Sequence, residues 1–102
     1  MAIPSVRSVG TVASGTAAIT PGLPSGAAAD DILVMVVETL NSQAITVTDW
    51  TEAGSSPQDE GTGATRLTVF WARYNGSSIN RTTSDSGDHQ IARIIAISGC
   101  IT

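Results

Sequence analysis

Apolar residues in this chain gather in three runs of strand length. Asp31 to Thr39 reads Asp-Ile-Leu-Val-Met-Val-Val-Glu-Thr, Arg66 to Tyr74 reads Arg-Leu-Thr-Val-Phe-Trp-Ala-Arg-Tyr, and His89 to Ser98 is dominated by isoleucine and alanine. Successive side chains of a strand point to opposite faces, so each run presents apolar residues on both sides. We therefore predict three strands that are buried on both faces and lie inside the architecture.

The run from Arg66 to Tyr74 carries the most specific pattern, because it holds three of the four aromatic residues of the chain. As a strand, it would place Leu67, Val69 and Trp71 on one face and Phe70, Ala72 and Tyr74 on the other. Trp71 is accordingly expected to be a core residue rather than a ligand-binding one.

Weaker alternation predicts further short strands. Ser5 to Val12 fits a first strand at an edge, and Ala44 to Trp50 fits a strand with one face in solvent. Two shorter strands are expected at Thr16 to Thr20 and at Ile79 to Thr83.

The remaining segments are rich in turn-forming residues. Pro21 to Ala29 contains two prolines and two glycines, which oppose regular ladder pairing, so an irregular connection is expected. Thr51 to Thr65 and Asn75 to Asp88 are polar stretches. Long loops of this kind often contact a partner.

These elements predict one all-β domain over residues 1–102, an antiparallel β-sandwich of the jelly-roll or immunoglobulin-like kind. We expect about six to eight strands and little or no helix. A sandwich monomer needs apolar residues only on its inner faces. This chain has apolar residues on more strand faces than that, which indicates either a tightly closed, barrel-like sandwich or an outer face covered by another subunit.

The composition disfavours some classes of partner. The chain of 102 residues has five arginines, no lysine and nine acidic residues, for a net charge of −4, so nucleic-acid binding is disfavoured. No apolar run approaches the length of a membrane span, and the N-terminus lacks the pattern of a signal peptide, so we expect no membrane partner. Cys100 is the single cysteine and is expected to be a small, buried apolar side chain rather than a reactive nucleophile.

Candidate chemistry is sparse. Asp85, Asp88 and the only histidine, His89, lie close in sequence, but their spacing matches neither a calcium loop nor a zinc motif and suits a Ser-Gly turn. No nucleophile, base and acid arrangement stands out. We predict no enzyme activity, no catalytic residue, no cofactor and no metal site.

Surface residues of the two polar loops and one tryptophan are the candidates for contact with a partner. Trp50, at the end of a predicted strand, is a candidate aromatic contact for a sugar or protein. The candidate loop residues are Ser55, Gln58, Asp59, Glu60, Asn75, Ser77 and Arg81.

Five short motifs along most of the chain resemble small β-rich modules associated with the virions of tailed bacteriophages, such as capsid decoration, head-fibre and tail proteins. They are Leu23-Pro-Ser-Gly26, Asp31-Ile-Leu-Val with Val37-Glu-Thr39, Thr48-Asp-Trp50, Thr65-Arg-Leu-Thr-Val-Phe-Trp71, and Asp85-Ser-Gly-Asp-His-Gln-Ile91. The resemblance carries no catalytic residues over to this chain.

The resemblance implies a structural virion protein, made in the host cytoplasm and located in the virion. The leading expectation is a capsid decoration or cement protein that binds the major capsid protein and forms a homo-oligomer, for which a trimer is one candidate state. The alternative is a tail or fibre module in which the polar loops attach to a host glycan or protein.

Overall fold

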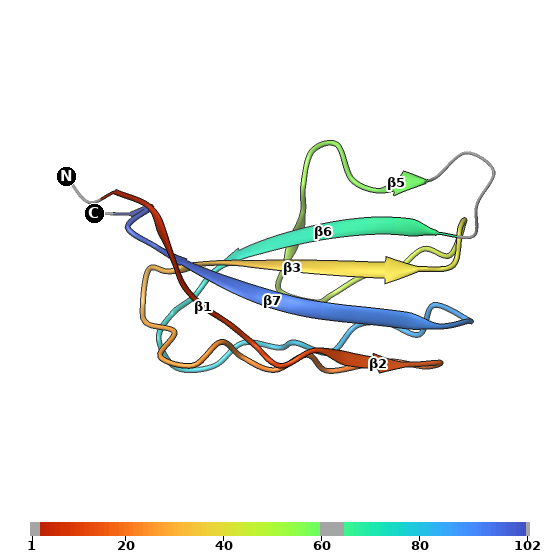
Figure 1. The fold of residues 1–102 in the computed structure, drawn as a ribbon, viewed down its shortest axis with the longest axis horizontal. Coiled ribbons are helices and arrows are strands. Elements are labelled where there is room, and N and C mark those ends of the chain that lie inside the picture. Colours follow the sequence, from red (N-terminus) through yellow and green to blue (C-terminus); the bar gives the residue numbers. More distant parts are fainter. Residues whose placement is uncertain (1–2, 60–64, 102) are drawn as a thin grey trace.

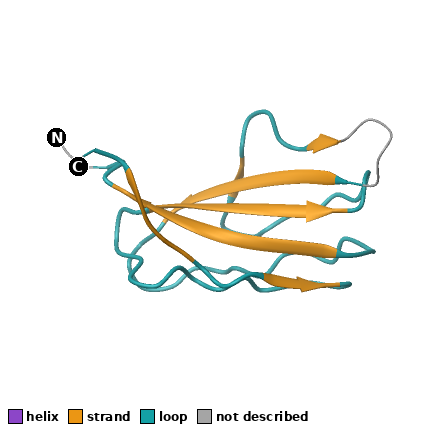
Figure 2. Ribbon diagram, viewed as in Figure 1, coloured by secondary structure: helices purple, strands orange, loops and turns teal. Residues whose placement is uncertain are grey.

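The computed structural model describes residues 3–59 and 65–101, and within these ranges it contains seven strands and no helix (Figures 1 and 2). All strand pairs are antiparallel, in the order β1-β7-β3-β6-β4, with β2 also pairing with β7 and β5 with β6. The strands are β1 (Ser5–Val9), β2 (Ala13–Gly15), β3 (Ile32–Thr39), β4 (Thr51–Glu52), β5 (Gln58–Asp59), β6 (Arg66–Arg73) and β7 (Gln90–Ser98).

β3 is the centre of the sheet and pairs along its whole length with β6 on one side and β7 on the other. Its side chains alternate between the two faces of the sheet, and Leu33, Met35 and Val37 are fully buried. They pack with Phe70 of β6 and Ile94 of β7 on the same face, which we call the inner face. The alternation of apolar residues thus becomes one continuous core beneath three long strands.

Three long connections return beneath the inner face and cover it. Residues 16–31 lead from β2 to β3, 40–50 lead from β3 to β4, and 74–89 lead from β6 to β7. Their apolar side chains, including Ile19, Ile45 and Val47, are buried in the core. The inner face is therefore closed by irregular chain rather than by a second regular sheet.

Hydrogen bonds join these connections into a second layer. The N–H of Thr83 donates to the carbonyl oxygen of Ile19 at 2.9 Å, and the N–H of Ser84 donates to that of Thr46 at 2.9 Å. Val47 and Thr83 also form an isolated antiparallel bridge. The prediction of an all-β, antiparallel fold consistent with a sandwich is confirmed, with the sheet as one layer and the connections as the other.

Several predicted elements differ in detail. Residues 16–20 and 79–83 cross beneath the sheet instead of forming strands of their own, and the second strand is Ala13–Gly15. Residues 44–50 bury Ile45 and Val47 as the alternation predicted, but pair with the neighbouring connections and not with the sheet. The pattern identified the buried side chains correctly, because alternation reports burial and not the partner of the backbone.

The polar loop predicted from Thr51 onwards contains two short strands. β4 and β5 both pair with β6, and the N–H of Ala53 donates to the carbonyl oxygen of Val69 at 2.8 Å. Their sequences, Thr-Glu and Gln-Asp, have no apolar alternation that could have indicated a strand. Pairing at this edge therefore depends on the neighbouring β6 backbone.

An ion pair anchors the N-terminal strand to the start of β3. The guanidinium of Arg7 donates from Nε to Oδ2 of Asp31 at 2.6 Å and from Nη2 to Oδ1 at 3.0 Å. The Asp31 carboxylate is almost fully buried and also accepts from the N–H of Ala28. The Arg7 hydrogen bonds keep the pKa of Asp31 below its ordinary value, so this carboxylate is ionised at neutral pH.

Candidate interaction surface

The side of the sheet opposite the core, which we call the outer face, is apolar and open. Arg73, Arg93 and Glu38 are the charged residues that the three long strands place on it. Its exposed apolar residues include Trp71, which is 43% exposed, and Val6, which is 62% exposed. The apolar members are Val6, Val9, Val12, Ile32, Val34, Val36, Leu67, Val69, Trp71, Ile91, Ile95 and Ile97.

A β-bulge extends this apolar surface onto β1. Val6 is paired with Ile97 and Val9 with Ile95, although residues three apart on a regular strand point to opposite faces. The register shifts between Val6 and Ser8, and this extra residue brings both valines to the outer face. The bulge residue is Arg7, whose side chain reaches Asp31.

The prediction that β6 is buried on both faces is wrong for the isolated chain. Phe70, Ala72 and Tyr74 are buried on the inner face, as expected. Leu67 and Trp71 on the outer face are 41% and 43% exposed, so Trp71 is not a core residue. Apolar residues do lie on both faces of β6, but Leu67 and Trp71 on the second face stay exposed among the described residues.

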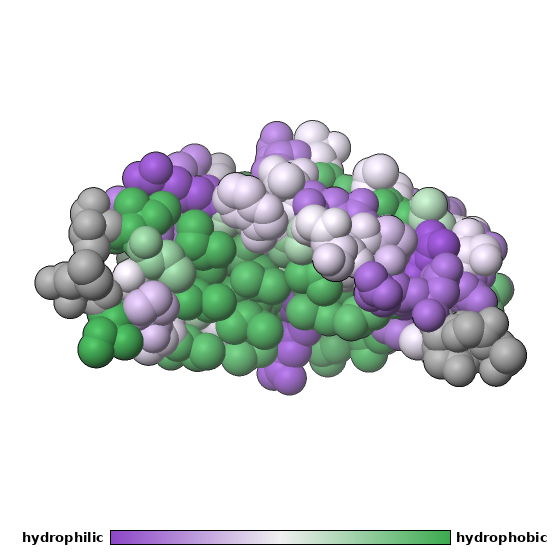
Figure 3. Space-filling view, turned by 90° about the horizontal axis from the view of Figure 1, so that it is seen from above, coloured by the Kyte–Doolittle hydropathy of each residue, from purple (hydrophilic) through white to green (hydrophobic). Residues whose placement is uncertain are grey.

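Figure 3 shows the consequence for the molecular surface, where apolar side chains form a continuous band bordered by polar ones. Monomeric proteins rarely expose contiguous apolar patches larger than a few hundred Å². A patch that spans four neighbouring strands is typical of a surface that another protein covers.

The outer face has two shallow hollows that share Leu67. The first, of about 230 Å³, lies between Leu67 and β7, where Val36, Ile91 and Val12 contribute to its lining. The second, also about 230 Å³, lies between Leu67 and the loop from Ala53 to Gln58. Both are lined almost entirely by apolar atoms, so each could receive an apolar side chain of a partner.

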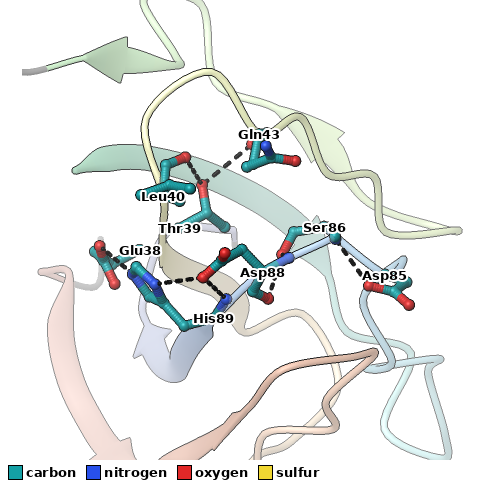
Figure 4. Close-up of polar contacts among 9 residues, drawn as sticks. Glu38, Thr39, Leu40, Gln43, Asp85, Ser86, Asp88 and His89 are labelled. Carbon is teal, nitrogen blue, oxygen red and sulfur yellow. Dashed lines mark hydrogen bonds and ion pairs between the residues drawn. The ribbon is translucent and has the colours of Figure 1, made fainter. Parts of the chain in front are cut away.

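A polar cluster marks the end of the outer face where β3 stops and β7 begins. The His89 ring lies between two carboxylates, with Nε2 at 3.0 Å from Oε1 of Glu38 and Nδ1 at 3.1 Å from Oδ1 of Asp88 (Figure 4). The pKa of His89 is raised above its ordinary value, mainly by the hydrogen bond to Glu38 and to a smaller extent by the hydrogen bond to Asp88. The pKa of Asp88 is lowered, mainly by the hydrogen bond that its carboxylate accepts from the backbone N–H of His89 and secondly by its hydrogen bond with the His89 ring.

This cluster does not assemble the three residues considered as metal ligands from sequence. Asp85 accepts from the N–H of Gly87 at 2.8 Å and lies on the far side of the turn from His89 (Figure 4). Glu38, which is 51 positions from His89, takes its place beside the ring. Among residues 3–59 and 65–101, no group of three or more His, Cys, Asp or Glu side chains is arranged to hold a metal ion.

The candidate loop residues lie at opposite ends of β6. Gln58 and Asp59 pair with its first residues, whereas Asn75 and Ser77 follow its last one. Eight strand residues span about 26 Å, so the two loops do not form one binding site. Glu60 lies outside the described residues.

The polar groups of these loops are largely occupied by contacts within the chain. Asp59 forms a two-point ion pair with Arg66, and the Gln58 amide donates to the carbonyl oxygen of Ser55. Asn75 accepts from the N–H of Ser77 at 2.8 Å, and Arg81 donates to the carbonyl oxygen of Pro21 at 2.7 Å. These side chains hold the loops in shape.

Trp50, the candidate aromatic contact, is half-buried and packs against the core. Its indole N–H donates to the carbonyl oxygen of Asn80 at 2.6 Å, which joins the connections 40–50 and 74–89. A stacking platform needs an accessible ring face, so Trp71 is the better exposed aromatic of the two.

The covering layer carries one larger polar hollow on its solvent side. It has a volume of about 510 Å³ and is lined by Thr46, Thr48, Asn80, Thr82, Thr83 and Ser84. Several of its polar groups are already paired, as in the contact of 2.8 Å between the hydroxyls of Thr82 and Thr20. It offers fewer free groups than its composition suggests.

Comparison with known proteins identifies no relative. No family model matches the chain, and neither the curated proteins nor the solved structures contain a significant match. Within the described residues, no helix is long and apolar enough to cross a membrane.

Proposed function

We propose that this protein is a structural subunit of a larger protein assembly, in which its outer face is covered by a neighbouring protein. The observation that carries the proposal is the apolar band over β1, β7, β3 and β6, with Trp71 and Leu67 exposed at one side. Leaving such a surface in water is unfavourable, and burying apolar area contributes about 25 cal/mol per Å².

The assembly we propose is a bacteriophage virion, with the chain as a capsid decoration or cement protein that oligomerises on the shell and binds the major capsid protein. This follows from the resemblance of its motifs to virion-associated modules. A lysine-free, acidic chain is consistent with a role that does not depend on packaged nucleic acid. A protein that binds only the assembled shell stabilises it by mass action.

The decisive experiment locates this protein in the virion and measures the stability of shells that lack it. Electron microscopy of the intact virion is expected to show many copies over the shell, and shells stripped of the protein are expected to rupture at lower temperature and at lower salt than complete ones. Stripped shells that resist heat and low salt unchanged contradict the cement role. Re-addition of the purified protein serves as the control, since it is expected to restore stability.

The alternative is a tail or fibre module for host attachment, and the polar hollow at Thr46, Thr48 and Asn80 is the feature that favours it. Hydroxyl groups such as those of Thr46 and Thr48 are suitable partners for sugar hydroxyls, whereas the Asn80 amide is already bonded to Thr48 and Thr82. This role predicts few copies per particle at the tail, together with saturable binding of the purified protein to host cells. Substitution of Thr48 by arginine would then abolish cell binding, while a decoration protein would be unaffected.

A further inference from the structure

We propose that the outer face packs against the outer face of a second copy of this chain, with the strands of the two sheets running in opposite directions. The inference rests on the proposed function and deepens it, since it names the partner of the apolar band and the orientation of that partner. The two copies would be related by a twofold axis that lies between the sheets and runs across the strands, through a point level with Met35. Each surface would then meet an identical one.

The size of the outer face reaches the lower limit for a specific pair. Four strands about 4.8 Å apart and a β3 length of about 26 Å give a footprint of roughly 500 Å² per copy, or about 1,000 Å² in total. Specific interfaces begin at about this size when the surfaces are complementary. Sheets that pack face to face also lie about 10 Å apart with interdigitating side chains, as apolar inner faces do in a sandwich.

Arg73 and Glu38, two of the three charged residues of the outer face, select the orientation. The third, Arg93, donates from Nε to the carbonyl oxygen of Gly10 at 2.7 Å, next to the end of β1. Arg73 is level with Ile32 at one end of the face, and Glu38 is level with Leu67 at the other end. These two levels lie three residues to either side of Met35, so a half-turn about the proposed axis brings Arg73 of each copy beside Glu38 of the other. Within its own chain, Arg73 is ion-paired with Asp30 and Glu38 contacts His89, so the contact between copies would extend two existing charge pairs. Parallel stacking would instead leave each Arg73 at the same end as its equivalent, away from Glu38.

The shape of the face supports the same orientation. Trp71 is the largest exposed side chain of the face, and the two hollows flank Leu67, which precedes it by four residues on the same side of β6. The half-turn places Trp71 of one copy over the segment from Leu67 to Val69 of the other, where the hollows lie. A tryptophan that enters an apolar hollow is a typical centre of binding energy.

Sedimentation velocity over a range of concentrations tests the pairing. The natural chain is expected to form dimers, whereas Trp71→Arg and Leu67→Arg are expected to weaken association at least tenfold, because each buries an unpaired charge. Thr48→Arg is the matched control: it adds the same charge to the covering layer and is expected to leave the dimer unchanged. Circular dichroism and thermal unfolding of the dilute variants check that they fold, since both substituted side chains point away from the core.

A chain that stays monomeric at several hundred micromolar overturns the proposal, as does a trimer or a dimer that neither substitution weakens. Dimerisation lost equally in Thr48→Arg would also contradict it. Binding to a different protein with the chain itself monomeric would assign the face to that partner instead.

The prediction that Cys100 is buried is wrong: this single cysteine is exposed, because it lies in the bend after β7, and it allows a direct test of orientation. Cys100 follows β7 near one end of the sheet, and a spin label attached there reports the distance between copies. β7 ends at Ser98, four residue levels from the axis, so the antiparallel arrangement places the two Ser98 residues about 26 Å apart and the labels just beyond them at about 25 Å or more. A distance below about 20 Å would mean parallel stacking and would overturn the proposed orientation.

These results are separable from the proposed role in the virion. A monomer that still binds and stabilises stripped shells would refute the pairing and leave the cement role standing. A dimer of the proposed geometry that does not bind shells would refute the role and leave the pairing standing.

Discussion

His89 Nε2 lies 3.0 Å from Oε1 of Glu38, and this contact joins the residue that precedes β7 to the last residue that β3 places on the outer face. The second ring nitrogen lies 3.1 Å from Oδ1 of Asp88. A protonated imidazole can donate to both carboxylates, whereas a neutral ring can donate to only one. The raised pKa of His89 expresses this preference for the charged form.

This contact predicts a pH dependence of the free energy of unfolding. Because the pKa of His89 is raised in the folded protein, its contribution is fully present below the ordinary pKa of about 6.5 and is lost as pH rises through the folded pKa. His89→Gln is expected to lack this loss of stability above about pH 6.5. Chemical denaturation at several pH values measures it, and NMR titration of the single histidine gives the pKa independently. Equal pH profiles for both proteins would contradict the prediction.

The sequence predicted the three long strands well, and this success has a physical reason. β3, β6 and β7 are apolar enough to form the core whatever the connections do, and the observed bounds agree with the predicted runs. The short strands depended on neighbours: β4 and β5 pair only because the backbone of β6 lies beside them. No local pattern encodes that proximity.

The candidate site was harder to predict for a different reason. The surplus of apolar faces was visible in the sequence, but alternation cannot say which face the chain covers itself. The three connections cover Phe70 and leave Trp71 open. Glu38 was missed because its partner lies 51 positions away, although a carboxylate in an otherwise apolar strand was a usable signal.

Gly10 is predicted to tolerate no side chain. A Cβ at this position would lie 2.0 Å from the carbonyl oxygen of Gly22, which is a backbone atom and not the end of a flexible side chain. Gly10 also donates to the carbonyl oxygen of Ile94 at 2.8 Å, so the segment cannot move away freely. Gly10→Ala is expected to destabilise the fold by about 1–3 kcal/mol or more.

Thermal and urea unfolding measure this effect, with Gly54→Ala as the control. A Cβ at Gly54 meets no atom within 4 Å, so this change is expected to be neutral or stabilising by up to about 1 kcal/mol. Similar losses in both variants would show that the close approach at Gly10 is not the cause.

Gln90 is predicted to hold the two layers together. Its side chain is buried, and Nε2 donates to the carbonyl oxygens of Ala17 at 2.9 Å and Ser84 at 3.0 Å. Its Oε1 accepts from the Thr83 hydroxyl at 2.6 Å. Gln90→Leu leaves these partners without their bonds, which costs roughly 1–3 kcal/mol per unsatisfied buried group.

Urea unfolding of Gln90→Leu is therefore expected to show a clear loss of stability, whereas Gln58→Leu, at an exposed position, should change it by less than about 0.5 kcal/mol. Amide hydrogen exchange adds a second measurement: faster exchange at the N–H groups of Thr83 and Ser84 would show that the covering layer has loosened. Unchanged exchange there would contradict the role assigned to Gln90.

Two leucines on opposite faces of the sheet separate stability from assembly. Leu33 is fully buried on the inner face, so Leu33→Ala is expected to cost about 2–5 kcal/mol, a large part of a total that is typically about 5–15 kcal/mol. Leu67 is 41% exposed on the outer face, and Leu67→Ala should cost less than about 1 kcal/mol in dilute solution.

At concentrations where the chain associates, the same Leu67→Ala change should lower stability further, because the assembled natural chain gains from burying that side chain. Urea unfolding at low and high protein concentration measures both effects. A Leu67→Ala cost that is independent of concentration would mean that the outer face contributes nothing to association.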